Sequence, residues 1–243
     1  ARVGRYAGDV LCVVGDRDAV TPQAIRDLFR EPFQVADYQL PISVTLGECS
    51  DEAAGSGTEV LQNAGLALTH AKTAAPGTWV QFSGTMAAAS GERLELLNAL
   101  RSAMGQQQLR LYYQPQVELS TGKVVGAEAL LRWWREDGRE VSPQVFIPLA
   151  ERSGLIRELG AWVIAAACRT VSCWREQGLG QLRVAVNVSA LQIRYGCCDR
   201  QVRDAMETFG VSGDQLEIEV TESVLLDNVE DAIECLKRLR GLG

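Results

Sequence analysis

The second half of the chain alternates short apolar runs with longer amphipathic segments. Two of the apolar runs are separated by the turn residues Ser120-Thr121-Gly122 and predict a pair of adjacent strands. The order of the predicted elements is strands at 109–117 and 124–133, helices at 143–152 and 155–177, a strand at 182–188, a helix at 201–209, a strand at 216–221 and a helix at 228–240. Repeated strand–helix units are typical of a parallel sheet or barrel with its site at the carboxyl ends of the strands.

The first part of the chain predicts shorter elements. Thr21 as N-cap and Pro22 in the first turn mark the start of a helix. The predicted elements are a buried strand at 10–14, a helix at 21–30, two strands within 33–46, a loop at 51–57, an amphipathic helix at 59–74 and a strand at 78–82. A small and polar stretch at 83–91 and a helix at 92–106 follow. We therefore divide the chain into a domain at 1–86, a linker helix at 87–105 and a second domain at 106–243.

The composition limits the classes of protein to which the chain can belong. The 243 residues are 47% hydrophobic with a net charge of −7, which predicts one or two folded domains that need no disulfide or metal to fold. The acidic balance argues against a nucleic-acid polymer as ligand, but it is compatible with one small phosphate compound. The longest apolar run, 161–168, is far shorter than the roughly 20 residues of a membrane span, and no targeting segment is visible.

Cysteine and histidine usage limits the possible chemistry. The seven cysteines lack the spacing of a disulfide framework or zinc knuckle, which favours reduced thiols and a cytoplasmic location. His70 is the single histidine, which argues against a histidine-based zinc site and against a Ser–His or Cys–His pair. Carboxylates, amides, Lys, Arg and metal ions remain as the groups that could carry a reaction.

Three oxygen-bearing side chains are predicted at strand ends: Glu128, Asn187 and Glu219. Successive strand ends of a barrel meet at one face, so these side chains are expected to converge. Two carboxylates and an amide form a set of hard oxygen donors that suits Mg²⁺, Mn²⁺ or Ca²⁺ rather than zinc. Taken singly, each glutamate could instead pair with a nearby arginine or cap a helix, and Glu222, which opens the loop before the next predicted helix, is a candidate for such a structural role.

Arg132 follows Glu128 by four residues, so both side chains lie on the same face of a strand. Its guanidinium could bind a phosphate in bidentate fashion or form an ion pair with Glu128. Gln114, followed by Pro115 at the predicted end of a strand, is a plausible polar contact for a ligand. The pair Trp133-Trp134 is interpreted as core and surface packing rather than as a platform for stacking bases.

Several motifs follow one another in this half of the chain, and they are Tyr112-Tyr113-Gln114-Pro115, Gly126-Ala127-Glu128-Ala129-Leu130-Leu131-Arg132-Trp133, Phe146-Ile147-Pro148-Leu149-Ala150-Glu151, Val186-Asn187-Val188-Ser189 and Glu219-Val220-Thr221-Glu222-Ser223. In this order, over residues 92–243, they resemble the EAL domain, the family of cyclic di-GMP phosphodiesterases. The resemblance implies a modified TIM barrel that uses two Mg²⁺ or Mn²⁺ ions. Such an enzyme hydrolyses cyclic di-GMP to linear pGpG.

The resemblance also assigns roles to residues of this chain. It implies that Glu128, Asn187 and Glu219 are metal ligands, and that Gln114 and Arg132 contact the substrate. Glu222 would order the loop that shapes the second metal site and the contact of a homodimer. The family's remaining carboxylates and its lysine would follow Gly243. We therefore expect the chain to end inside the barrel and to be inactive alone, the activity belonging to a longer parent.

Residues 1–86 resemble, more weakly, the C-terminal half of a GGDEF domain, the fold of diguanylate cyclases. The matching segments are 5–11, at the family's signature hairpin, 42–47 and 63–72. Ala7 replaces the first glycine of the signature, and Val10 replaces a metal-binding glutamate. Ala1 occupies the place of the product-inhibition aspartate. The resemblance thus implies an α+β fragment without cyclase activity and with a regulatory role, and leaves open whether it binds GTP.

Two functions from different classes follow. The first is a cyclic di-GMP phosphodiesterase with an inactive GGDEF-like partner domain. The second is a non-catalytic cyclic di-GMP receptor that keeps the barrel but lacks metal ligands. The presence of Glu128, Asn187 and Glu219 favours the enzyme. The sequence leaves open the signal that the parent senses and whether this cytoplasmic part is attached to a membrane anchor.

Overall fold

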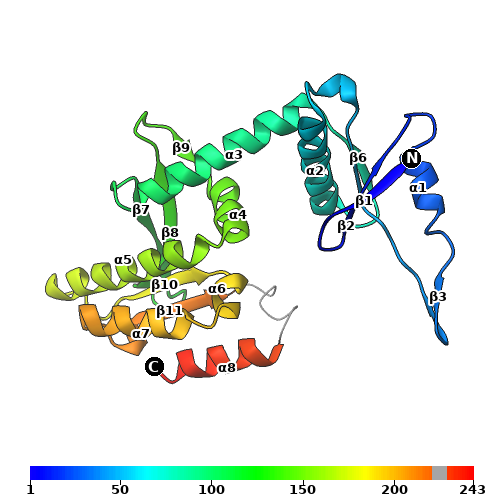
Figure 1. Cartoon of the computed structure of the whole chain (residues 1–243). Helices are drawn as coiled ribbons and strands as arrows, with labels where there is room; N and C mark the ends of the chain where they lie inside the picture. Colours follow the sequence, from blue (N-terminus) through cyan, green and yellow to red (C-terminus); the bar gives the residue numbers. More distant parts are fainter. Residues whose placement is uncertain (221–228) are drawn as a thin grey trace. The chain divides into compact units, whose positions relative to one another are not determined.

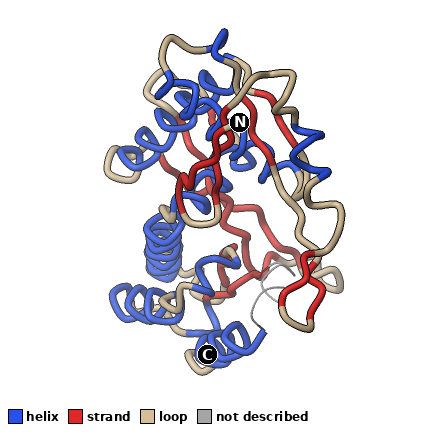
Figure 2. Tube along the Cα trace, turned by 45° about the vertical axis from the view of Figure 1, so that its right-hand side comes forward, coloured by secondary structure: helices blue, strands red, loops and turns tan. Residues whose placement is uncertain are grey.

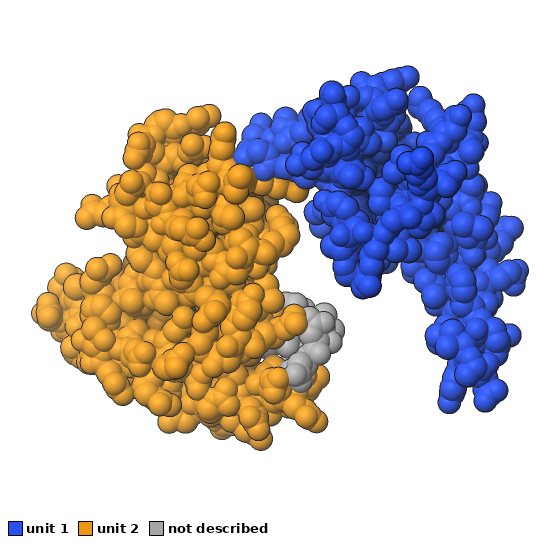
Figure 3. Space-filling view, viewed as in Figure 1, with its two compact units in different colours: residues 1–92 blue, residues 93–243 orange. Residues whose placement is uncertain are grey.

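The structure is a computed structural model that describes residues 1–220 and 229–243. The chain divides into two compact units, Ala1–Glu92 and Arg93–Gly243 (Figure 3). The first unit holds three separate two-stranded sheets. Its elements are β1 (Arg2–Ala7), β2 (Val10–Val14), α1 (Pro22–Asp27), β3 (Phe33–Val35), β4 (Tyr38–Leu40), β5 (Leu46–Glu48), a 3₁₀ turn (Asp51–Ala53), α2 (Gly57–Ala74) and β6 (Trp79–Gln81).

Two of the three sheets in the first unit pair strands that follow each other directly along the chain, and the third pairs strands that are separated by a helix. β1 pairs with β2 and β3 with β4 as antiparallel hairpins, whereas β5 and β6 run parallel and lie against α2. Helix α1 begins as predicted, because the Thr21 hydroxyl accepts a hydrogen bond from the Ala24 N–H. Gly47 of β5 lies so close to the backbone of Leu68 in α2 that no side chain fits there.

Several predictions for this unit are wrong in detail. The strand at 10–14 is half-exposed rather than buried, since β1 covers only its edge. Helix α1 ends at Asp27 instead of residue 30, and residues 41–45 form no strand although their apolar residues alternate. The expected loop at 51–57 contains a 3₁₀ turn and the start of α2. The expected polar stretch at 83–91 is almost wholly helical, because α3 begins at Gly84.

The second unit is built around one mixed sheet with helices on one side (Figure 1). The strands follow the order β11-β10-β8-β7, with β9 paired to β8. Its elements are α3 (Gly84–Ala103, shared with the first unit), β7 (Leu109–Val117), β8 (Val124–Trp134), β9 (Glu140–Val141), α4 (Pro143–Ser153), α5 (Ile156–Glu176), β10 (Arg183–Val188), α6 (Ala190–Arg194), α7 (Cys198–Phe209), a 3₁₀ turn (Gly213–Gln215), β11 (Leu216–Val220) and α8 (Val229–Arg240).

The predicted strand–helix alternation of this unit is confirmed, with two corrections. β8, β10 and β11 are parallel, but β7 and β9 run antiparallel to β8, so the sheet is not purely parallel. The second concerns α6, a short helix that the sequence analysis does not predict and that begins at a Ser189–Gln192 capping box. All seven cysteines are free thiols.

Along the strands of this sheet, which are drawn red in Figure 2, successive residues belong to opposite faces. Val184, Val186 and Val188 of β10 pack into a core formed with α5, α7 and α8. A second core joins β7 and β8 to α3, α4 and α5 around Trp133 and Phe146. We call the opposite side of the sheet the polar face. It carries Arg110, Tyr112, Gln114 and Gln116 of β7, Gly126, Glu128, Leu130 and Arg132 of β8, Arg183, Ala185 and Asn187 of β10, and Glu217 and Glu219 of β11.

Candidate active site

The register of the strands brings the predicted site residues together on the polar face. Glu128 of β8 lies opposite Gln114 of β7 on one side and opposite Ala185 of β10 on the other. Asn187, two residues further along β10, lies opposite Glu219 of β11. Because side chains two residues apart share a face, these four of the predicted site residues point to the same side of the sheet.

Glu128 and Asn187 are joined directly. The Asn187 Nδ2 donates a hydrogen bond of 2.7 Å to the Glu128 Oε1. This bond fixes the orientation of the carboxylate and leaves the amide oxygen of Asn187 available to a ligand. The prediction that Glu128 ends a strand is wrong, because it is the fifth of the eleven residues of β8, which extends past β10. Asn187 and Glu219 do lie at the penultimate positions of their strands.

Glu219 completes the acidic part of the site. Burial raises the pKa of the Glu219 carboxyl above its usual range, and the nearby carboxylates of Glu128 and Glu217 raise it further. Repulsion between carboxylates of this kind is relieved when a cation binds between them. The donor chemistry therefore fits a hard divalent cation held by Glu128, Asn187 and Glu219. Within residues 1–220 and 229–243, no cluster of three or more His, Cys, Asp or Glu side chains is arranged to hold a metal ion.

Arg132 does not pair with Glu128. Its Nε lies 3.5 Å from the Glu140 Oε1 on β9, and its guanidinium also donates to the Leu131 carbonyl at 2.9 Å. The alternative of a Glu128–Arg132 ion pair is therefore wrong, and the guanidinium lies further along the polar face. Gln114 is exposed. Glu222 lies outside the described residues.

The polar face also carries an ion pair that the sequence analysis does not predict. It lies nearer the start of β10 and β11 than Asn187 and Glu219 do. The Arg183 Nε lies 3.0 Å from the Glu217 Oε2, joining β10 to β11. The Arg183 side chain passes over Gly126, where a Cβ would lie 2.7 Å from the Arg183 Cγ. The alternation of residues within 183–187 and 217–219 places Arg183 and Glu217 on the same face as Asn187 and Glu219. Their pairing would follow from the sequence only if the register of β10 with β11 were known.

Gly126→Ala is expected to lower the free energy of unfolding by about 1–3 kcal/mol. The added Cβ would lie 2.7 Å from the Arg183 carbonyl oxygen, so the β8–β10 pairing must shift, and with it the Glu128–Asn187 hydrogen bond. Urea unfolding followed by circular dichroism measures the loss. As a control, Gly65→Ala in α2 meets nothing within 4 Å and should be neutral or stabilising. Unchanged stability of Gly126→Ala would contradict the close approach.

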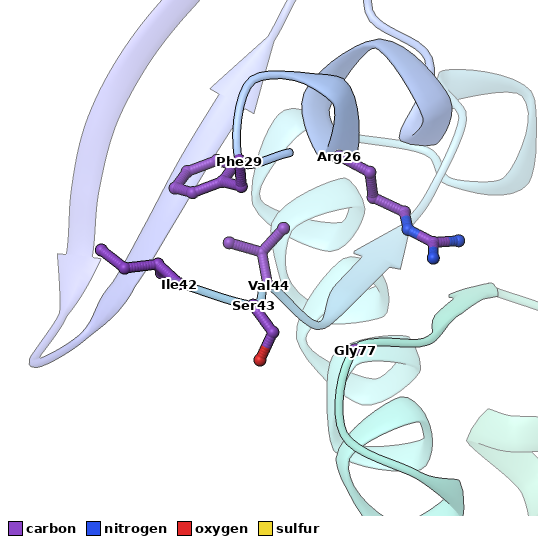
Figure 4. Close-up of a pocket in the computed structure, with 6 residues that line it drawn as sticks. All are labelled: Arg26, Phe29, Ile42, Ser43, Val44 and Gly77. Atoms are coloured by element: carbon purple, nitrogen blue, oxygen red, sulfur yellow. The ribbon is translucent and has the colours of Figure 1, made fainter. Parts of the chain in front are cut away.

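One surface pocket is lined by none of these residues. It belongs to the first unit and is lined by Arg26, Phe29, Ile42, Ser43, Val44 and Gly77 (Figure 4). The Arg26 guanidinium is directed away from the aromatic ring of Phe29, and no carboxylate lines the pocket. The pocket thus contributes no side chain to the oxygen-donor site on the polar face.

The second unit is an α/β domain whose mixed sheet carries carboxylates and an amide on its open face, and its likeness to solved EAL structures makes this fold TIM-barrel-like. The family model of the EAL domain matches residues 97–243, which is more than half of the chain, and the chain belongs to this family. The prediction of the family from its motifs is confirmed for this part of the chain.

Curated relatives match well beyond the EAL segment. The chain is 36% identical over 219 residues to the oxygen sensor protein DosP of Escherichia coli, which covers 90% of the chain and 27% of the relative. It is 34% identical over 247 residues to the cyclic di-GMP phosphodiesterase NbdA of Pseudomonas aeruginosa, which covers 99% of the chain and 32% of the relative. The chain thus spans about a third or less of the length of these relatives.

A solved structure shares the fold of the second unit. The complex of the PaMucR phosphodiesterase with cyclic di-GMP has a TM-score of 0.58 and 38% sequence identity, and the match covers 61% of this chain and 60% of that one. Among the described residues, no helix is long and apolar enough to span a bilayer.

Proposed function

We propose that this chain forms part of a cyclic di-GMP phosphodiesterase and contributes to both its metal site and its substrate site. The observation that carries the proposal is the convergence of Glu128, Asn187 and Glu219 on the polar face of an EAL sheet. A relative of 34% identity is named a cyclic di-GMP phosphodiesterase, and the similar solved structure is a cyclic di-GMP complex.

The three oxygen donors would hold Mg²⁺ or Mn²⁺, with two ions expected in the complete domain. When bound, the metal would polarise the phosphate and lower the pKa of an attacking water. Asn187 would keep the Glu128 carboxylate oriented through its 2.7 Å hydrogen bond. Glu128 would thus be a catalytic residue that acts as a metal ligand. Glu222 is proposed to order the adjoining loop and a homodimer contact.

Substrate binding is assigned to side chains on the neighbouring strands. Gln114, directly opposite Glu128, would hydrogen-bond the nucleotide through its exposed amide. Arg132 would bind a phosphate, since its guanidinium shares the polar face with Glu128. The Glu140 carboxylate, 3.5 Å from Arg132, would hold the guanidinium in place until the ligand arrives.

For the first unit we propose a regulatory, GGDEF-like role without cyclase activity. Residues 5–11 form a hairpin whose turn has Gly8 at a φ of +52°, and β2 begins at Val10, whose side chain cannot ligate Mg²⁺. GTP is the ligand that such a domain would take. The whole protein incubated with GTP and Mg²⁺ should therefore form no cyclic di-GMP.

The proposed activity can be tested on the full-length protein that carries this sequence. Incubation with cyclic di-GMP and Mg²⁺ or Mn²⁺ should yield linear pGpG, and a chelator should stop the reaction, because the oxygen donors need the cation. Chromatography separates the substrate from the product. Binding of cyclic di-GMP without turnover would identify a receptor instead of an enzyme, and absence of both would overturn the proposal.

A further inference from the structure

Two arginines lie directly opposite each other on the polar face. Arg110 of β7 is the Cα partner of Arg132 of β8 in the antiparallel pair. Both belong to the same alternating set of residues as Gln114 and Glu128, so both side chains project from the polar face. Arg110 is exposed, whereas Arg132 is partly buried, with 29% of its side chain accessible.

Like charges that face each other across two strands destabilise a sheet. Glu140 lies 3.5 Å from Arg132 on the far side from β7, and it offsets one of the two positive charges. Within residues 1–220 and 229–243 Arg110 forms no ion pair, so one positive charge in the row formed by Arg110 and Arg132 is not offset. An anion that lies between the two guanidinium groups would remove the repulsion and gain two charge-assisted hydrogen bonds.

The position of the row indicates which anion it would take. At a rise of about 3.3 Å per strand residue, the Arg110–Arg132 row lies about 13 Å along β8 from Glu128. The Arg132 guanidinium is also held at Glu140 on β9, away from Glu128, so one phosphate of a ligand does not lie against the metal ligands and between both arginines at once. A cyclic dinucleotide carries two phosphodiester groups separated by nucleosides, and it can present one group to each place.

We propose that Arg110 is a second phosphate-binding residue, which together with Arg132 holds the phosphodiester of the cyclic dinucleotide that is not being cleaved. This inference rests on the proposed function, because it names a further contact of the same substrate. The arrangement selects for ligands with two phosphates. A cyclic mononucleotide, with its single phosphate, can use the oxygen-donor site or the arginine row but not both.

Arg110→Gln tests the inference in the full-length protein. Affinity for cyclic di-GMP is measured by titration calorimetry in EDTA, and with Mg²⁺ in a Glu128→Gln background that prevents turnover. Arg110→Gln should weaken binding about tenfold, or about 1.4 kcal/mol, and Arg110→Lys should lose less because the charge remains. Arg200→Gln in α7, which removes the same charge from an exposed helix position, should bind as the wild type does.

Thermal unfolding without ligand separates a binding role from a structural one. Removing Arg110 relieves the repulsion with Arg132, so the melting temperature of Arg110→Gln should stay the same or rise while affinity falls. A lower melting temperature together with the weaker binding, or binding equal to wild type, would overturn the inference alone. Absence of cyclic di-GMP binding by the wild type would overturn the proposed function and this inference with it.

Discussion

Replacing Glu128 by glutamine should reduce cyclic di-GMP hydrolysis by the full-length protein by a factor on the order of 1,000 or more, which is about 4 kcal/mol of activation free energy. The substitution removes one of the two carboxylates of the proposed metal site and keeps the shape of the side chain. The charge that holds the cation next to Asn187 and Glu219 is then halved. Initial rates of pGpG formation at saturating Mg²⁺ or Mn²⁺ measure the effect.

The fold should tolerate this change. Glutamine can still accept the hydrogen bond from Asn187 Nδ2, so the melting temperature of Glu128→Gln is expected to remain close to that of the wild type. Glu158→Gln, an exposed position near the start of α5, removes the same charge far from the polar face and should leave the rate unchanged. Undiminished turnover by Glu128→Gln would show that Glu128 is not a metal ligand.

Trp133→Ala should lower the free energy of unfolding by about 3–5 kcal/mol. The Trp133 side chain is fully buried, and its ring meets Phe146 of α4 edge-on at a centroid distance of 5.6 Å. Its removal leaves a cavity between β8 and the helices that position the sheet. Urea unfolding of the chain followed by circular dichroism gives the difference directly.

Val145→Ala is the matched control, because it lies beside Phe146 but its side chain is half-exposed. Its effect should stay within about 0.5 kcal/mol. A loss below about 1 kcal/mol for Trp133→Ala would mean that the second core does not anchor β8. The interpretation of Trp133 as a core residue, made from the sequence, is consistent with its complete burial.

Local patterns were sufficient to predict most of the second unit. The strands β7, β8, β10 and β11 have clear apolar alternation or apolar runs, and turn residues such as Gly122, with a φ of +70°, end them where predicted. Prediction failed where packing decides the structure. Residues 41–45 alternate like a strand but pair with none of the strands that the structure describes, and 84–91 are helical despite their small residues.

The candidate site was likewise predictable only in part. The motifs identified the side chains that are expected to supply oxygen donors, and in the structure a hydrogen bond joins two of them, Glu128 and Asn187. The sequence could not show that Glu128 lies within a strand rather than at its end, because β8 extends past its neighbour. It also could not pair Arg132 with Glu140 or align Arg110 with Arg132, since these relations depend on the register between strands, which no motif specifies.

The strict alternation of the two faces restricts where the chain can change its length. Deleting or inserting one residue between Gly126 and Arg132 would rotate every following side chain of β8 by half a turn. The carboxylate or the guanidinium would then enter the apolar layer beneath the helices, while Ala129 or Leu131 would take its place in the solvent. Length variation among homologous proteins is therefore expected in the turns at 118–123 and 135–139, and not within the strand that connects them.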